Sequence, residues 1–227
     1  MNTQKMQLVG LALAVGLSGS AQATLMDRGG GLIYDTDLNV TWMQDANYAQ
    51  TSGYITNGHM TWDEANTWAT NLDYGGYTDW RLPTTNNAST PCTNTYTYSG
   101  GTCGFNNPGT SELSHLFYIE LGNLAWISPT GQIQSNSGLV NKGPFINFYE
   151  NNYWSGTDYV LDPSNAWTFY TTDGGQFEGN KIEAYGYALA VRNGDVAAVP
   201  EPEAWGLMLS GLGLVGWAAR RRQANNK

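Results

Sequence analysis

The chain has 227 residues, with 19 acidic residues against 10 basic ones, and its formal net charge is −9. Five basic and seventeen acidic residues fall between positions 24 and 199, so this part carries a formal charge of −12. Such a surface repels polyanions, which excludes nucleic acid as a partner and disfavours anionic lipid. A low content of charged residues with many Trp, Tyr and Gly is typical of loop-rich extracellular β proteins.

The first 23 residues are typical of a secretory signal peptide. Lys5 precedes an apolar run over residues 8–17, and Ala21 and Ala23 have the small-x-small spacing of a cleavage site. The run is too short for a stable membrane span. We therefore expect residues 1–23 to be removed after Ala23, the alternative being a buried N-terminal helix.

The first strands are expected soon afterwards. Leu32–Tyr34 and Val40–Met43 are short apolar runs on either side of a polar turn that contains two aspartates. This pattern predicts a β-hairpin.

The stretch from Met60 to Thr84 predicts a short helix with a rigid apolar exit. Thr61 and Glu64 have the spacing of a capping box, so the helix is expected to begin at Thr61. Apolar residues recur on one face at Ala65, Trp68, Ala69 and Leu72. Gly75 and Gly76 are expected to end the helix, because glycine adopts positive φ without a Cβ clash.

The exit of this helix contains a single base, Arg81, among apolar residues. We expect Arg81 to pair with a carboxylate or with the last carbonyls of the helix. Alternation of side chains predicts a strand over Tyr187–Arg192. The helix is expected to pack across a sheet that contains this strand, with four large side chains buried together: Trp68, Trp80, Leu82 and Trp154.

Cys92 and Cys103 are the only two cysteines. In an exported chain, an even pair that closes a short loop predicts a disulfide. A redox-active or catalytic pair is the alternative, but no histidine or other base lies beside either cysteine in the sequence.

A second helix is predicted after Thr110-Ser111-Glu112, which supplies its N-terminal cap. Its buried stripe is Leu113, Leu116, Phe117 and Leu121, and Gly122 ends it. The two histidines, His59 and His115, lack the spacing of a zinc motif and are expected to lie on the surface. The sequence thus predicts no metal site and no cofactor, and only a structural calcium ion stays open.

The region from Tyr153 to Lys181 combines aromatic, amide and carboxylate side chains. Aromatic faces with polar groups suit sugar rings, so we expect Asp158 and Asn165 to contact a ligand, with Tyr159 and Tyr170 as stacking partners. Trp154 and Trp167 are expected in the core. Turns are predicted at residues 162–165 and 173–175.

The C-terminus has the order of a sorting signal. Pro200, Glu201 and Pro202 precede an apolar stretch over residues 204–219, and Arg220, Arg221 and Arg222 follow it. As a helix this stretch would be about 24 Å long, slightly short of a bilayer core. The arginines would mark its cytoplasmic side. We expect residues 204–219 to form a transmembrane helix.

Two resemblances follow from these motifs. The C-terminal pattern resembles the PEP-CTERM sorting signal of Gram-negative bacteria, which implies processing by an exosortase-type enzyme. The motifs at residues 38–42, 79–84, 153–157 and 188–192 resemble the domain named after the C-terminal region of Legionella collagen-like proteins. That domain is similar to C-type lectins and, more distantly, to formylglycine-generating enzymes. The resemblance implies an α+β fold with two short helices and a twisted, mostly antiparallel sheet.

We therefore divide the chain into a signal peptide (1–23), a C-type-lectin-like ectodomain (24–198) and a sorting signal (199–227). The expected function is that of an exported, non-catalytic binding module for an envelope polysaccharide or protein. It would be anchored in the inner membrane during sorting and then located at the cell surface or in the extracellular matrix. The alternatives are an enzyme on a formylglycine-generating scaffold and a structural biofilm or matrix protein without a discrete ligand.

Overall fold

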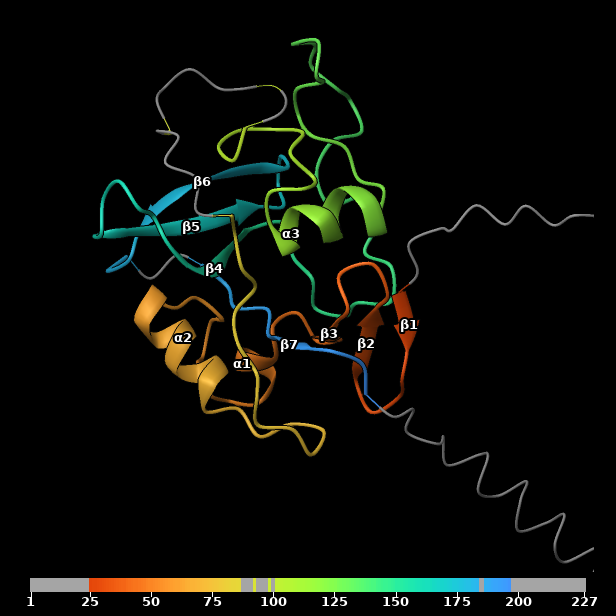
Figure 1. Cartoon of the computed structure of the whole chain (residues 1–227), viewed down its shortest axis with the longest axis vertical. Coiled ribbons are helices and arrows are strands. Elements are labelled where there is room, and N and C mark those ends of the chain that lie inside the picture. The colour runs from red at the N-terminus through yellow and green to blue at the C-terminus, as the bar shows by residue number, and fades with distance from the viewer. Residues whose placement is uncertain (1–24, 87–91, 93–97, 99–100, 184–185, 197–227) are drawn as a thin grey trace, which may run out of the picture.

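The structure is a computed structural model that describes residues 25–86, 92, 98, 101–183 and 186–196. These residues form two antiparallel sheets with short helices beside them (Figure 1). The predicted α+β class is confirmed, whereas the single predicted sheet is replaced by two.

The first sheet has the order β1-β2-β3-β7, with strands β1 (Leu25–Asp27), β2 (Leu32–Asp35), β3 (Val40–Met43) and β7 (Val191–Asn193). The second has the order β4-β5-β6, with strands β4 (Asn152–Asp158), β5 (Asn165–Tyr170) and β6 (Gly175–Asn180). The helical elements are α1 (Tyr48–Thr51), α2 (Trp62–Thr70), α3 (Glu112–His115) and the π-helical turn η1 (Leu116–Glu120).

Helix α2 begins as predicted and ends earlier than predicted. The Glu64 amide donates to the Thr61 hydroxyl at 3.3 Å, and the Thr61 amide donates to the Glu64 carboxylate at 2.9 Å, which completes the capping box. The helix ends at Thr70, before the glycine pair. Gly75 and Gly76, with φ of 64° and 82°, instead form a tight turn between the bridged residues Tyr74 and Tyr77. Positive φ at both central positions is the requirement of a type I′ turn.

The predicted hairpin is formed by β2 and β3, which place Ile33 opposite Trp42. Asp35 shapes its turn, because one oxygen of its carboxylate accepts the amides of Asp37 and Leu38, each at 3.0 Å. The other oxygen accepts the Trp42 indole at 3.2 Å. The hairpin is thus fixed by one buried carboxylate.

The second sheet confirms the two turns predicted in the late region. Asp162 accepts the Ser164 amide at 3.0 Å in the loop between β4 and β5. Asp173 accepts the Gly175 amide at 2.8 Å in the turn between β5 and β6. The pairing of β4 with β5 is irregular between Trp154 and Asp158, where the register shifts.

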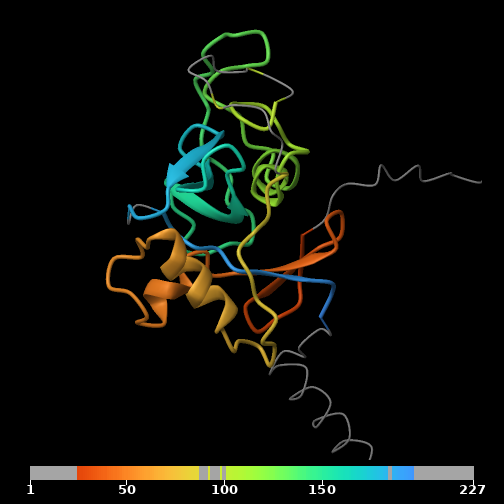
Figure 2. The ribbon, with the colours of Figure 1, turned by 60° about the vertical axis from the view of Figure 1, so that its left-hand side comes forward.

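A nearly extended segment joins the two sheets. Tyr187 forms a parallel bridge with Tyr153 of β4, and Val191 pairs with Trp42 of β3. Figure 2 shows the segment leading into β7 as it passes from the second sheet to the first. Of the strand predicted over residues 187–192, only the part from Val191 onward is regular, because the earlier residues pair partly with each sheet.

This segment is apolar on both sides and therefore separates two cores. Leu189 and Val191 pack in one hydrophobic cluster, while Ala188 and Ala190 pack in the other. The second cluster contains all four residues that were predicted to be buried together, Trp68, Trp80, Leu82 and Trp154. Helix α2 packs against β4 there, and the Trp154 indole donates to the Met60 carbonyl at 2.9 Å. The predicted core is confirmed.

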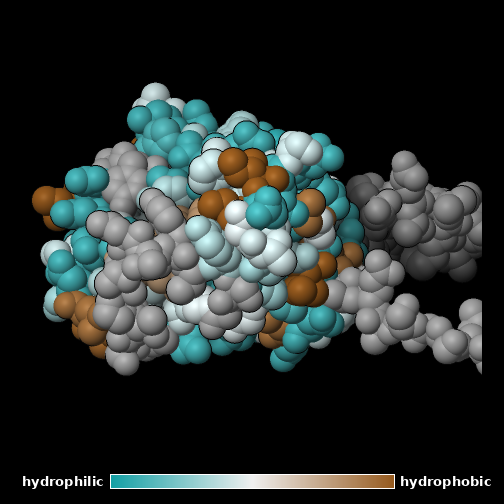
Figure 3. Space-filling view, turned by 90° about the horizontal axis from the view of Figure 1, so that it is seen from above, coloured by the Kyte–Doolittle hydropathy of each residue, from teal (hydrophilic) through white to brown (hydrophobic). Residues whose placement is uncertain are grey.

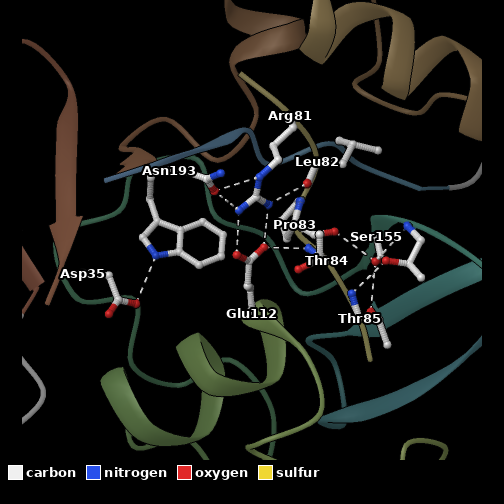
Figure 4. A network of polar contacts seen from close by, with 11 residues as sticks. Asp35, Arg81, Leu82, Pro83, Thr84, Thr85, Glu112, Ser155 and Asn193 are labelled. Carbon is white, nitrogen blue, oxygen red and sulfur yellow. Dashed lines mark hydrogen bonds and ion pairs between the residues drawn. The ribbon is translucent and has the colours of Figure 1, made fainter. Parts of the chain in front are cut away.

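Arg81 pairs with a carboxylate, as predicted (Figure 4). Its guanidinium donates to both oxygens of Glu112, at 2.7 and 2.8 Å, and to the Asn193 side chain at 2.6 Å. Glu112 also accepts the Thr84 amide at 2.6 Å. One ion pair therefore joins the loop after α2, strand β7 and the start of α3.

A second set of contacts ties the same loop to the other sheet. The Thr85 hydroxyl donates to the Ser155 hydroxyl at 2.9 Å, and Ser155 in turn donates to the Pro83 carbonyl at 2.9 Å (Figure 4). The Gly156 amide donates to the same carbonyl at 2.8 Å. The loop after α2 is thus bonded to β4 as well as to β7.

No helix within the described part of the chain is long and apolar enough to cross a membrane. The predicted transmembrane helix (204–219) and the predicted signal peptide (1–23) lie outside the described residues.

The ion pair at Arg81 leads to the first testable prediction. Arg81→Met should lower the free energy of unfolding by about 2 to 3 kcal/mol, because it leaves the mostly buried Glu112 carboxylate without its charged partner. Urea denaturation of the full chain measures this value.

Arg28→Met is the matched control. Arg28 also pairs with a carboxylate, but its partner Asp195 has a side chain that is 42% exposed. Loss of a solvent-exposed pair should cost less than about 1 kcal/mol. If both substitutions lowered the free energy of unfolding by the same amount, the burial of Glu112 would add nothing to the contribution of the Arg81 ion pair.

Candidate ligand-binding site

The turn between β5 and β6 places three side chains around one hollow. Tyr170 ends β5, Asp173 lies in the turn, and Phe177 follows on β6. Tyr170 and Phe177 meet edge to face, with ring centroids 5.5 Å apart. The hairpin thus supplies two aromatic rings and a carboxylate.

The chain near residue 105 adds a third ring. Gly104 and Gln176 exchange backbone hydrogen bonds of 2.8 and 2.9 Å, which attach this loop to the edge strand β6. Phe105 is thereby placed edge to face with Phe177, at a centroid distance of 5.8 Å. The Gln176 side chain donates to the Thr102 carbonyl at 2.6 Å, which attaches the loop before Phe105 to β6 a second time.

Trp126 completes the site. Its amide donates to the Asp173 carbonyl at 2.7 Å, and its side chain is 46% exposed. The resulting pocket has a volume of about 510 Å³, within the range of small-molecule sites. We call it the aromatic pocket, and its lining residues are Phe105, Trp126, Tyr170, Asp173 and Phe177.

The shape of the turn depends on glycine and on Tyr118. Gly174 has a φ of 74°, and a Cβ there would lie 2.7 Å from the Tyr118 hydroxyl. That hydroxyl donates to the Gly174 carbonyl and accepts the Asn106 amide at 3.0 Å. Burial raises the pKa of the Tyr118 phenol, so it stays a donor at neutral pH. Tyr118 of η1 therefore holds both sides of the aromatic pocket.

The chemistry of the aromatic pocket suits an uncharged polar ligand. Aromatic faces pack on apolar C–H surfaces, and a carboxylate accepts hydrogen bonds from hydroxyl groups. Burial raises the pKa of Asp173, while the Gly175 amide that it accepts acts in the opposite direction. A sugar ring offers both the C–H surface and the hydroxyl donors.

The four ligand contacts predicted from the sequence do not form one site. Asp158 and Asn165 lie at one end of the β4–β5 pair, whereas Tyr170 lies at the other end of β5. Five residue steps along a strand separate Asn165 from Tyr170 by about 17 Å. Asp158 is already paired with Lys181, whose ammonium also lies over the Trp62 ring at 4.3 Å. Of the four, only Tyr170 lines the aromatic pocket.

Tyr159, predicted from the sequence as a stacking partner, lies in the interior of the protein. Its side chain is 6% exposed, and its ring packs edge to face on Trp167 with centroids 5.1 Å apart. Its hydroxyl accepts the Cys92 amide at 2.9 Å. Tyr159 thus supports the cysteine loop. Trp154 and Trp167 are fully buried, as predicted.

The disulfide between Cys92 and Cys103 is confirmed, with Cα atoms 5.4 Å apart. Both cysteines pack in a small cluster with Tyr159 and Trp167. Phe105 follows Cys103 by two residues, so the disulfide restrains the loop that contributes a ring to the aromatic pocket.

The two histidines are only partly exposed, in contrast to the expectation of surface positions. His59 packs on the Tyr187 ring, with centroids 4.6 Å apart. The His115 side chain is 17% exposed and points toward acidic residues. Tertiary packing, which the spacing of the two histidines does not reveal, accounts for both positions.

Sequence reasoning missed Phe105 and Trp126, because they come from loops far from the late region. The only available signal was a tryptophan beside a Pro- and Gly-containing turn, at residues 126–131. On the face seen in Figure 3, hydrophobic residues form separate small patches among hydrophilic ones.

Two family models match the chain. The model described as the Lcl C-terminal domain matches residues 31–192, and the model described as the PEP-CTERM protein-sorting motif matches residues 198–222. No curated protein and no solved structure matches it. The matches confirm both resemblances, while the likeness to C-type lectins stays a prediction.

The disulfide leads to the second testable prediction. Replacing Cys92 and Cys103 together by serine should lower stability by about 3 kcal/mol in the loop-entropy model, or about 6 to 12 °C in Tm. Because the closed loop is local, near-UV circular dichroism should otherwise stay that of a folded chain.

Reduction of the wild-type protein is the control and should give the same loss. Two free thiols in the natively exported chain, detected by alkylation and mass shift, would contradict the disulfide.

Proposed function

The chain belongs to the Lcl C-terminal domain family and carries a PEP-CTERM sorting motif, and from this we propose that it is an exported binding module for a neutral polysaccharide. The ligand would occupy the aromatic pocket, and the protein would turn over no substrate. The observation that carries the proposal is the convergence of four aromatic side chains and one carboxylate in a pocket of about 510 Å³.

The sorting motif implies export through the membrane of a Gram-negative bacterium and processing by an exosortase-type system. The destination belongs to the proposal, and we place the processed chain at the cell surface or in the extracellular matrix. A matrix location would bring the aromatic pocket into contact with secreted polysaccharide.

Charge favours a neutral ligand over an acidic one. The formal charge of −12 between residues 24 and 199 disfavours polymers of uronic acid or phosphate. Asp173 adds a carboxylate to the pocket itself. A neutral sugar avoids this repulsion and still offers hydroxyl donors.

The alternative of an enzyme on a formylglycine-generating scaffold would need cysteine chemistry. Both cysteines of the chain are joined in the disulfide between Cys92 and Cys103. This favours a binding role for the chain. The other alternative, a structural matrix protein without a discrete ligand, is disfavoured by a pocket with an exposed tryptophan.

Substitution of Trp126 gives the third testable prediction. Trp126→Ala should weaken binding of neutral oligosaccharides about tenfold to hundredfold, because it removes the most exposed ring of the aromatic pocket. Binding of the full chain to an array of neutral and acidic oligosaccharides, followed by calorimetry on the best neutral one, measures the change.

Asp158→Ala is the control, since Asp158 is exposed and lies at the other end of the sheet. It should leave affinity unchanged. If Asp158→Ala abolished binding while Trp126→Ala retained it, the ligand would lie at the Asp158 end of the second sheet, which would contradict the proposal. Steady-state turnover of any bound glycan would contradict the non-catalytic role.

A further inference from the structure

A second group of polar side chains lies between the β2–β3 hairpin and the α3–η1 helical segment. Asp35 ends β2, His115 ends α3, and Glu120 ends η1. One carboxylate oxygen from each acid and one imidazole nitrogen all lie within 4.8 Å of one another. Neither the family matches nor the proposed function assigns a role to this group.

The π-helical turn brings His115 and Glu120 together. Around an α-helix with 3.6 residues per turn, positions five apart are separated by about 140°. In η1 the Leu121 amide bonds to the Leu116 carbonyl, five residues earlier, at 3.0 Å. This wider turn brings positions five apart closer to the same face of the helix than an α-helical turn does. The His115 Nε2 and a Glu120 carboxylate oxygen are consequently 3.4 Å apart.

The polar atoms of this pair lack hydrogen-bond partners. The Glu120 side chain is only 1% exposed. Within the described part of the chain, neither Glu120 oxygen makes a hydrogen bond, and neither does the His115 Nε2. Buried polar atoms normally have a partner, and each one without a partner is costly. Three such atoms, in a group that also contains the Asp35 carboxylate, indicate a ligand.

The third member, Asp35, is held in place. It is fully buried, and its carboxylate accepts two backbone amides and the Trp42 indole, as Figure 4 shows for the indole. Hydrogen bonds of this kind orient a ligating carboxylate around a metal ion. They also leave oxygen lone pairs free for a further bond.

The local charge calls for a cation. The Asp35 and Glu120 carboxylates lie close together around His115, and the Asp37 carboxylate lies on the same side of the imidazole. Among the described residues, no Lys or Arg lies within ion-pair distance of these three acids. The Asp37 carboxylate, 45% exposed and 3.9 Å from His115, marks the side of the group that is open to solvent.

We propose that Asp35, His115 and Glu120 bind a divalent transition-metal ion that pins the β2–β3 hairpin to the α3–η1 segment. Two ligand atoms on a tetrahedral zinc ion are about 3.3 to 3.5 Å apart, which agrees with the separation of His115 and Glu120. An imidazole ligand favours zinc-like ions over calcium, which takes oxygen ligands.

A simple ion pair between His115 and Glu120 is the competing explanation. The pair is 3.4 Å apart without hydrogen-bond geometry, and the second oxygen of Glu120 would stay without a partner. A metal ion satisfies the nitrogen and the carboxylate at once.

Zinc titration of the full chain, stripped with a chelator after export, tests the proposal. Calorimetry should give one Zn²⁺ per wild-type chain, and Zn²⁺ at a hundredfold excess over its Kd should raise Tm by about 5 to 10 °C. Glu120→Gln should lower the affinity at least tenfold, because the loss of a residue that merely supports a metal ligand already costs that much. Glu150→Gln, the same change at an exposed site, should bind as the wild type does.

A second measurement covers the case in which Glu120→Gln fails to fold. The wild-type chain has only two histidines, so Zn²⁺ should shift the imidazole NMR signals of His115 and leave those of His59 in place. The proposal is overturned if the wild-type chain takes up neither Zn²⁺ nor Co²⁺, if His115 does not respond, or if Ca²⁺ raises Tm as much as Zn²⁺ does.

Discussion

The structure depends on the ion pair between Arg81 and Glu112. Arg81 follows the helix whose capping box is visible in the sequence, and Glu112 begins α3 about thirty residues later. A guanidinium can bond both carboxylate oxygens at once, so the pair fixes the orientation of α3 as well as its position. From that start, η1 directs Tyr118 toward the aromatic pocket and Glu120 toward Asp35. Both candidate sites therefore rest on the same helical segment.

Patterns that are local in the sequence predicted local structure well. The capping box at Thr61, the β2–β3 hairpin and the loop closed by Cys92 and Cys103 each involve residues close in sequence. Alternation before β7 correctly indicated an extended segment. It did not reveal that Ala188 and Ala190 are buried as fully as Leu189, because small apolar residues fit either an exposed face or a second core.

The candidate sites were harder to predict because their residues meet only in the folded chain. The aromatic pocket combines Phe105, Trp126 and a hairpin near residue 173, and none of their spacings carries a signal. The burial of Tyr159 against Trp167 was not visible in the sequence, because the two residues meet only once the irregular pair of β4 and β5 has formed. The π-helical turn, which brings His115 beside Glu120, is likewise invisible in an apolar pattern that also fits an α-helix.

Binding of a neutral sugar in the aromatic pocket is tested most directly by the indole NMR signals of the chain. The chain has nine tryptophans, of which Trp42, Trp154 and Trp167 are fully buried, whereas Trp126 is 46% exposed. During titration with a neutral oligosaccharide selected on the array, the Trp126 indole signal should shift and saturate while those of the buried indoles stay in place. A saturable shift confined to amides around Asp158 and Asn165, with no change at Trp126, would contradict the account.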